Sequence, residues 1–354
     1  MSVMDAASTP RDRRHLARQL QVVLVILLCG AALCSLAIGA SGASLWAALW
    51  QIAQGQPIAP IDAIVLWDIR APRTVLGICV GAALALSGAV MQGLFRNPLA
   101  DPGLLGVSAG ATLGAIIAIV LGGVLPLWLS QWLGAAMLPV FAFVGATGAM
   151  LILYAVATRS GRTSVATMLL GGIALSAMVG AVVGLLIFRA DDLQLRAFSF
   201  WTLGSLAGST WDKTTIAAPF ILLAIGLSTT LAAGLNGLAL GEASAHHIGI
   251  PVQRVKYAAI LLVGGATGAA VAVSGGIGFV GIVVPHLIRL LTGPDHHGLL
   301  VNSALLGASL LLCADIIARL VVAPAELPIG IVTAILGAPV FLWILLRRRA
   351  TVDL

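Results

Sequence analysis

Charged residues are scarce in this chain of 354 residues. Asp, Glu, Lys and Arg together make up 9% of it, against about 25% in an average soluble protein, and 60% of the residues are apolar. This composition excludes a soluble globular domain. A membrane helix takes about 20 apolar residues, so the chain has room for ten spans. Lipid does not tolerate unpaired backbone groups, and the long apolar runs lack the alternation of barrel strands, so the spans are predicted to be helices.

Lysine is nearly absent. Lys213 and Lys256 are the two lysines among 19 basic residues, and neither fits the Walker A pattern G-x-x-x-x-G-K-[ST]. The chain therefore does not bind ATP by a P-loop. The four cysteines match no metal or disulfide spacing. The net charge of +6 does not indicate a nucleic-acid partner, because the basic residues are spread along short loops.

The apolar runs predict an all-α polytopic membrane protein with three parts. We expect an N-terminal tail over 1–19, a ten-helix transmembrane domain over 20–346 and a C-terminal tail over 347–354. The first run could instead be a cleaved signal peptide, but it is longer than a signal core of about 7 to 15 residues, so an uncleaved span is favoured. The predicted spans are residues 20–40, 74–95, 103–125, 135–157, 164–188, 214–235, 255–274, 277–292, 299–322 and 328–346.

The distribution of basic residues predicts the orientation of these spans. With ten spans and the N-terminus inside, thirteen of the 19 basic residues fall on the inner side, so the positive-inside rule places both termini in the cytoplasm. Seven of the eight tryptophans then gather at the outer interface, as in an aromatic belt. The inner basic residues are Arg11, Arg13, Arg14, Arg18, Arg96, Arg159, Arg162, Arg254, Lys256, Arg289, Arg347, Arg348 and Arg349.

Glycine is abundant, with 41 residues, and the G-x-x-x-G spacing recurs. Small residues let membrane helices approach closely, so these pairs predict a tightly packed bundle. Residues 77–88 (GICVGAALALSG) also align with 264–275 (GGATGAAVAVSG) at seven of twelve positions. Because these segments belong to the second and seventh spans, which cross in opposite senses, we expect an inverted repeat of five spans. Such repeats are frequent in transporters.

The longest inner connection, residues 237–251, reads as one or two short amphipathic turns bounded by Gly241, Gly249 and Pro251. Docking of a partner and packing on the membrane surface explain it equally well. The adjacent His246 and His247 do not form a metal pair, because neighbouring residues on a helix point about 100° apart and no third ligand is near.

A second group of polar residues is predicted at the outer side. Arg70 and Arg73 precede the second span, and Arg319 lies near the outer end of the ninth. These arginines could form a ring of cations that meets an acidic partner. The residues alone favour the simpler reading, in which they extend to the headgroups and Asp315 pairs with Arg319 one turn away.

Several long motifs resemble those of the FecCD-type permeases, the membrane subunits of ABC importers for ferric siderophores, haem and vitamin B12. The resemblance covers roughly residues 65–346. The motifs are Arg70 to Arg73 (RAPR), Gly81 to Gly93 (GAALALSGAVMQG), Arg96 to Gly110 (RNPLADPGLLGVSAG), Trp201 to Gly208 (WTLGSLAG), Gly241 to Gly249 (GEASAHHIG), Ser274 to Arg289 (SGGIGFVGIVVPHLIR) and Ala314 to Pro339 (ADIIARLVVAPAELPIGIVTAILGAP).

The resemblance implies a homodimer in the bacterial inner membrane, with two ATPase subunits beneath it and a periplasmic binding protein above. ATP and Mg²⁺ would then be bound by the ATPase subunits, and this chain would carry no cofactor. Arg70, Arg73 and Arg319 would face glutamates of the binding protein. The fifth span, residues 198–208 and the tenth span would border the pathway. The coupling helix would be formed by Leu240, Gly241, Glu242, Ala243, Ser244, Ala245, His246, His247, Ile248 and Gly249.

The cargo implied by the resemblance is haem, because residues 91–103 and 200–208 look most like haem importers, with vitamin B12 or a ferric siderophore as the alternative. Two other classes of protein can be weighed against this reading. An ion-coupled secondary transporter needs an ionisable site within the membrane, and the sequence offers only Asp315, which Arg319 can neutralise. An intramembrane enzyme needs a nucleophile-base pair or metal ligands, and no such arrangement is visible.

Overall fold

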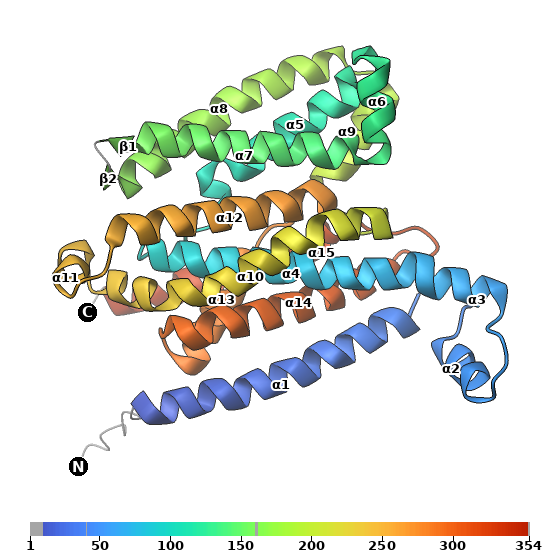
Figure 1. Ribbon diagram of the computed structural model, residues 1–354, viewed down its shortest axis with the longest axis horizontal. Coiled ribbons are helices and arrows are strands. Elements are labelled where there is room, and N and C mark those ends of the chain that lie inside the picture. Colours follow the sequence, from blue (N-terminus) through green and yellow to red (C-terminus); the bar gives the residue numbers. More distant parts are fainter. Residues whose placement is uncertain (1–9, 40, 160–161, 353–354) are drawn as a thin grey trace.

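The computed structural model describes residues 10–39, 41–159 and 162–352 and is almost entirely helical (Figure 1). Within that part of the chain, eight helices are long and apolar enough to cross a membrane, and two shorter apolar helices, Val280–Thr292 and Ile329–Ile344, lie where the eighth and tenth spans were expected. Together these ten helices cover the ten apolar runs. The ten are α1 (Pro10–Ala37), α4 (Ala71–Leu94), α5 (Val107–Leu121), α7 (Met137–Ala157), α8 (Val165–Arg189), α10 (Trp211–Ala239), α12 (Val252–Ser274), α13 (Val280–Thr292), α14 (His296–Leu320) and α15 (Ile329–Val352).

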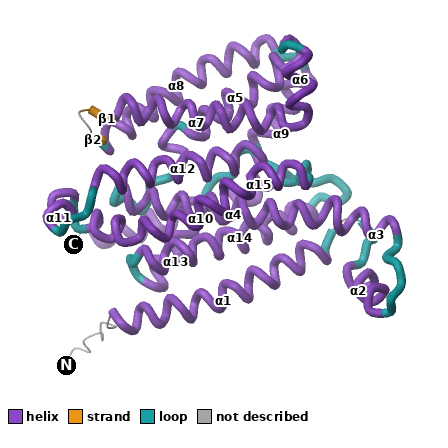
Figure 2. Tube along the Cα trace, viewed as in Figure 1, coloured by secondary structure: helices purple, strands orange, loops and turns teal. Residues whose placement is uncertain are grey.

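Short elements connect the spans at the two ends of the bundle (Figure 2). At one end, the α2 end, lie α2 (Leu45–Ala53), α3 (Pro60–Ile64), α6 (Leu127–Leu133) and α9 (Asp192–Thr202). At the opposite end, the α11 end, lie α11 (Glu242–His247) and a hairpin of the two-residue strands β1 (Thr158–Arg159) and β2 (Arg162–Thr163). The start of α1 and the end of α15 also lie at the α11 end, as an even number of spans requires.

Helix α4 is the centre of the molecule. The most apolar stretch of its span is 89% buried, against 22% for α8. Around α4 pack α14, α10, α12 and α13, while α5, α7 and α8 form a separate layer on the other side of α12 (Figure 1). Other helices of the chain surround most of α4. Its position is therefore fixed by contacts between helices rather than by contact with lipid.

Glycines make the close contacts at the centre possible. A Cβ on Gly88 of α4 would collide with the backbone carbonyl of Gly281 on α13, and one on Gly110 of α5 would collide with that of Gly145 on α7. The backbones can therefore touch only where no side chain is present. Gly180 and Gly184 of α8 differ, because a Cβ on either would meet no atom of this chain within 4 Å.

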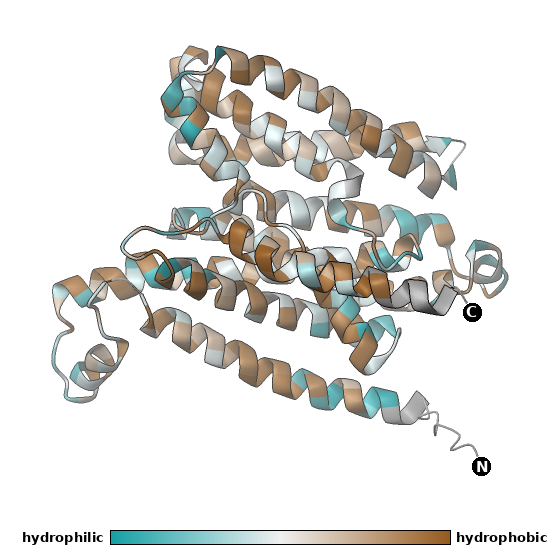
Figure 3. Cartoon of the chain, turned by 180° about the vertical axis from the view of Figure 1, so that it is seen from behind, coloured by the Kyte–Doolittle hydropathy of each residue, from teal (hydrophilic) through white to brown (hydrophobic). Residues whose placement is uncertain are grey.

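The surface has the character of a membrane protein. Apolar residues, coloured brown, run along the helices, and many of the hydrophilic residues, coloured teal, lie toward the ends of the helices (Figure 3). Seven tryptophans belong to the elements of the α2 end, where Trp211 Nε1 donates a hydrogen bond to the Trp67 carbonyl at 2.9 Å. This confirms the predicted gathering of tryptophans at one interface.

Helices α4 and α12, which carry the matching glycine segments, lie side by side and run in opposite directions (Figure 1). Opposite directions are what an inverted repeat requires of its second and seventh spans. The repeat itself, as a relationship between five spans and five spans, stays a prediction.

Candidate functional site

Two sets of residues were expected to meet partners, and they lie at opposite ends of the bundle. The arginines Arg70, Arg73 and Arg319 lie at the α2 end, and the segment from Leu240 to Gly249 lies at the α11 end (Figure 1). The membrane separates the two sets, so any effect of one on the other passes along the spans.

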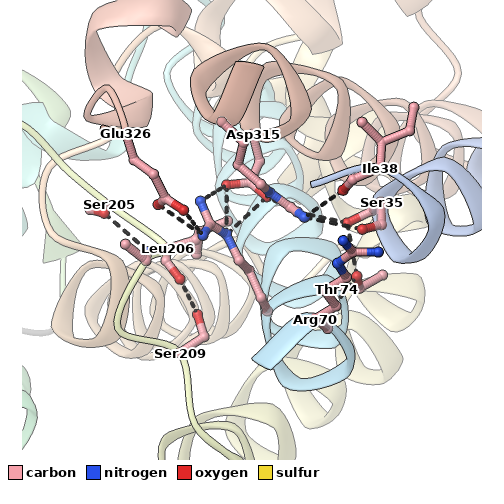
Figure 4. A network of polar contacts seen from close by, with 12 residues as sticks. Ser35, Ile38, Arg70, Thr74, Ser205, Leu206, Ser209, Asp315 and Glu326 are labelled. Atoms are coloured by element: carbon pink, nitrogen blue, oxygen red, sulfur yellow. Dashed lines mark hydrogen bonds and ion pairs between the residues drawn. The ribbon is translucent and has the colours of Figure 1, made fainter. Parts of the chain in front are cut away.

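Asp315 and Glu326 are the two carboxylates of an ionic cluster at the α2 end (Figure 4), and Arg73 lies between them. Its Nε donates to Asp315 Oδ1 at 3.1 Å, and its Nη2 donates to the same oxygen at 2.8 Å. Its Nη1 donates to both carboxylate oxygens of Glu326, at 3.0 and 2.9 Å. The side chains of Arg73 and Asp315 are 6% and 1% exposed, whereas that of Glu326 is 34% exposed. Glu326 is thus the anion of the cluster that water can reach.

Arg319 completes the cluster from the same helix as Asp315. Its Nε donates to Asp315 Oδ2 at 2.9 Å, and its Nη2 also contacts this oxygen. Its other bonds reach α1, where Nη1 donates to the Ser35 carbonyl at 3.0 Å and Nη2 to Ser35 Oγ at 2.8 Å. Asp315 therefore joins two arginines, and the cluster fastens α1, α4, α14 and the α14–α15 connection together.

Arg70 stands at the end of the π-helical turn Val65–Arg70 and is also buried. Its guanidinium donates to the carbonyls of Leu36 at 2.8 Å and Ala37 at 3.1 Å, and to Ser41 Oγ at 3.0 Å. These acceptors belong to the end of α1 and the chain that follows it. Arg70 thus holds the α1–α2 connection against α4 without a carboxylate partner among these contacts.

The simpler reading, in which the three arginines extend to the headgroups, is wrong for this structure. Arg70, Arg73 and Arg319 are 3%, 5% and 4% exposed, and each makes several bonds within the chain. A buried guanidinium needs partners because desolvating an unpaired charge is costly. The pairing of Asp315 with Arg319, which the residues alone favoured, is present. Whether these arginines receive a binding protein stays a prediction.

Glu326 was not singled out from the sequence. It is 253 residues from Arg73 and belongs to an irregular connection, so no spacing rule links the two. One signal was available. Three arginines and one aspartate at the same depth leave two cations uncompensated, and buried charges are paired.

The coupling segment forms a compact turn on the α11 end. Gly241 begins it at φ +101 and Gly249 ends it at φ +84, both in the left-handed region that favours glycine. Ala245 is fully buried, and its carbonyl accepts from the Ile250 N–H at 3.0 Å. The exposed side chains are Leu240, Ala243, Ser244, His246, His247 and Ile248. Helix α11 thus presents a small mixed face beyond the bundle, as predicted for a short amphipathic turn.

The connection between α4 and α5 also lies at the α11 end. Asp101 Oδ1 accepts from the Gly103 N–H at 2.7 Å and caps the 3₁₀ turn Pro102–Leu105. Burial raises the pKa of Asp101, and the Gly103 N–H opposes this shift. The segment behaves as a structured helix connection.

Comparison with known proteins agrees with this architecture. The sequence profile of the FecCD transport family matches residues 23–347. The chain belongs to the FecCD transport family. It is the permease subunit of an ABC importer and an inner-membrane protein.

Several named permeases are similar to this chain over most of its length. It is 46% identical over 336 residues to the hemin transport system permease HmuU of Yersinia pestis, which covers 93% of this chain and 95% of the relative. It is 44% identical over 307 residues to the vitamin B12 import permease BtuC of Escherichia coli, covering 86% and 91%. Among solved structures, an inward-facing metal-chelate type ABC transporter superposes with a TM-score of 0.79 at 34% identity, covering 92% and 97%.

Proposed function

We propose that this permease moves haem from the periplasm to the cytoplasm. The observation that carries the proposal is the 46% identity to the hemin permease across nearly the whole of both chains, which exceeds the 42% and 44% identity to vitamin B12 permeases of similar coverage. The family resemblance adds a homodimer, two ATPase subunits that bind ATP and Mg²⁺, and a periplasmic binding protein. Both termini are cytoplasmic in this proposal. The start of α1 and the end of α15 lie at the α11 end together with most of the basic residues of the chain, and the positive-inside rule places that end in the cytoplasm.

Helix α8 supports a homodimer. Side chains along it are exposed, among them Leu170, Ile173 and Phe188, and Gly180 and Gly184 have open space around them. Glycines at this spacing let two helices approach closely. A second copy seated on this face would place α8 beside the pathway between the two subunits.

The coupling helix of the proposal is the segment from Leu240 to Gly249. Its exposed face stands at the α11 end, where ATPase subunits would bind from the cytoplasm. Replacing residues 240–249 by a Gly/Ser linker that keeps Glu242, which pairs with the buried Lys256, and the buried Ala245 should leave the fold intact and abolish uptake. Normal uptake by this variant would refute the assignment.

In this proposal the binding protein docks at the arginine cluster by competing with the partners that the arginines have within the chain. Because Arg70, Arg73 and Arg319 already have internal partners, a carboxylate from outside must compete for them. Glu326 is the competitor to displace, since it is partly exposed and holds Arg73 Nη1. Exchanging Arg73 for Glu would place a second carboxylate against Asp315, so that change tests the fold rather than docking.

The cargo is tested by reconstituting the permease with its ATPase and binding protein in liposomes. Uptake of haem, cobalamin and a ferric siderophore is then compared at equal ATP. Concentrative uptake of haem alone supports the proposal, and preference for cobalamin or the siderophore refutes it. The permease without its ATPase should accumulate none of the three, and accumulation driven by an ion gradient would contradict the ABC mechanism.

A further inference from the structure

Lys256 is a lysine buried at the α11 end of α12, and its side chain is only 3% exposed. Its Nζ lies 2.7 Å from Glu242 Oε1, on the first residue of α11. The same Nζ donates a hydrogen bond to the carbonyl of Thr163 at 2.9 Å. One ammonium group therefore touches the coupling helix on one side and the α7–α8 hairpin on the other.

The hairpin is held at Thr163 by both of its main-chain polar groups. The Thr163 N–H donates to Gln253 Oε1 at 3.1 Å, and its carbonyl accepts from Lys256. Gln253 and Lys256 are three positions apart on α12, which puts both on one face of the helix. Strand β2 ends at Thr163, and Ser164 then caps α8 by accepting from the Thr167 N–H at 3.2 Å. No free linker separates the clamped residue from α8.

These contacts form a continuous link between two elements that are far apart in sequence. Glu242 lies on α11, Lys256 on α12 and Thr163 next to the start of α8. The Lys256 end of this ion pair is buried, whereas the Glu242 side chain is 43% exposed. Separating the two leaves the buried ammonium bonded to the neutral Thr163 carbonyl, and a buried charge is costly to leave without a counter-charge. Lys256 has three N–H donors, so it can hold both acceptors at once and link α11 to the start of α8.

We propose that Lys256 is a coupling residue, which passes a displacement of α11 through the Thr163 backbone to the inner end of α8. The inference rests on the proposed function, in which α11 receives the ATPase movement and α8 borders the pathway. It assigns a role to a residue outside the coupling segment. Lys256 is a positioning residue, because it acts through Glu242 and Thr163 and touches no cargo.

A purely structural role for Lys256 makes a different prediction from a coupling role. If the residue only stabilises the fold, its removal lowers the amount of folded permease, and every folded molecule still moves the same amount of cargo per ATP. If the residue couples, folded complexes hydrolyse ATP without moving cargo. The ratio of haem taken up to ATP hydrolysed separates the two cases.

The test uses the full complex in liposomes, with Lys256→Met and the matched variant Arg254→Met. Arg254 is a cation two positions away on the same helix, and its side chain is exposed. We expect Lys256→Met to keep ATPase binding and hydrolysis within about twofold and to lower haem uptake per ATP at least tenfold. Arg254→Met should leave the ratio unchanged. The double variant Lys256→Met with Glu242→Gln removes both charges, so it folds even if the single variant does not, and it should show the same loss.

An unchanged uptake per ATP in Lys256→Met or in the double variant overturns the proposal. An equal loss in Arg254→Met also overturns the proposal, because the loss would then follow from removing any positive charge at this surface. Failure of the proposed function has a different signature. In that case the Gly/Ser replacement of residues 240–249 leaves uptake intact, whatever Lys256 does.

Discussion

Arg73 and Asp315 are 242 residues apart in the sequence and meet at the α2 end of the bundle, with Arg73 Nη2 2.8 Å from Asp315 Oδ1. Neither side chain is more than 6% exposed. Arg319 approaches the same aspartate from one turn along α14, so a single carboxylate compensates two guanidinium groups. Asp315 therefore holds together the ends of α4 and α14 that lie at the α2 end of the bundle.

The first prediction concerns the stability that Asp315 provides. Asp315→Asn leaves the buried Arg319 without its carboxylate and Arg73 with Glu326 alone, and removing one partner of a buried pair costs about 3–5 kcal/mol. Glu326→Gln should cost at most about 1 kcal/mol, since its carboxylate is partly exposed. Thermal unfolding of both variants in the same detergent measures the difference. Equal losses would mean that burial does not decide the strength of these pairs.

The second prediction concerns binding-protein docking at Glu326. Glu326→Gln frees Arg73 Nη1 from a competing charge, so the loaded binding protein should bind about two- to fivefold more tightly, the effect of one partly exposed ion pair. The gain should shrink at high salt, which screens charges that water can reach. Asp192→Asn, which removes an exposed carboxylate from the first turn of α9 at the same end of the bundle, is the control. Weaker or unchanged binding at low ionic strength would place docking elsewhere.

The third prediction separates two kinds of glycine. Gly88→Leu puts a side chain into the backbone of Gly281, so the bundle should not assemble and the permease should be lost from the membrane. A Cβ on Gly180 or Gly184 meets no atom of the same chain within 4 Å, so Gly180→Leu with Gly184→Leu should leave the subunit folded. This pair should instead weaken the homodimer, which cross-linking and size-exclusion chromatography can measure. A fully dimeric double variant would remove α8 from the interface.

The fourth prediction is a pH dependence at the α11 end. Burial opposes ionisation of Asp295, but hydrogen bonds from His297 and Asn236 outweigh it and lower its pKa to about 2. A carboxyl with a lowered folded-state pKa stabilises the fold above its ordinary pKa of 3.8, and this contribution is lost as the pH falls from there toward 2. In the Asp295→Asn variant the free energy of unfolding should depend less on pH in that window. Its pH dependence between pH 5 and pH 7 should stay the same. If the Asp295→Asn variant keeps the pH dependence of the wild-type protein in this window, other carboxyl groups cause that dependence.

The spans could be predicted from the sequence because lipid imposes a simple rule on composition. All ten predicted runs coincide with helices, and the glycine spacing correctly indicated close packing of α5 on α7. Periodicity does not say which helix is central, however. That α4 is enclosed follows from its contacts with α14 and α10, which begin more than 100 residues later.

The candidate site was harder to predict, for a physical reason. Motifs located Arg73 and Glu242 in the sequence, but a charged residue near a helix end can point to water or into the bundle. Arg73 points inward because Asp315 and Glu326 are there to receive it, and both are more than 240 residues away. Lys256 was counted only as an inner cation, since neither Glu242 nor Thr163 stands at a helical spacing from it.

The enclosure of α4 has a consequence for biosynthesis. The ribosome completes α4 more than 200 residues before α14, the helix that covers it and supplies the counter-ion for Arg73. Until then the cationic end of α4 lacks its Asp315 counter-ion, although α10 and α12, which also pack on α4, are made earlier. Docking of α14 against a helix made near the beginning is therefore a late step in the folding of the subunit, and it closes the ionic cluster.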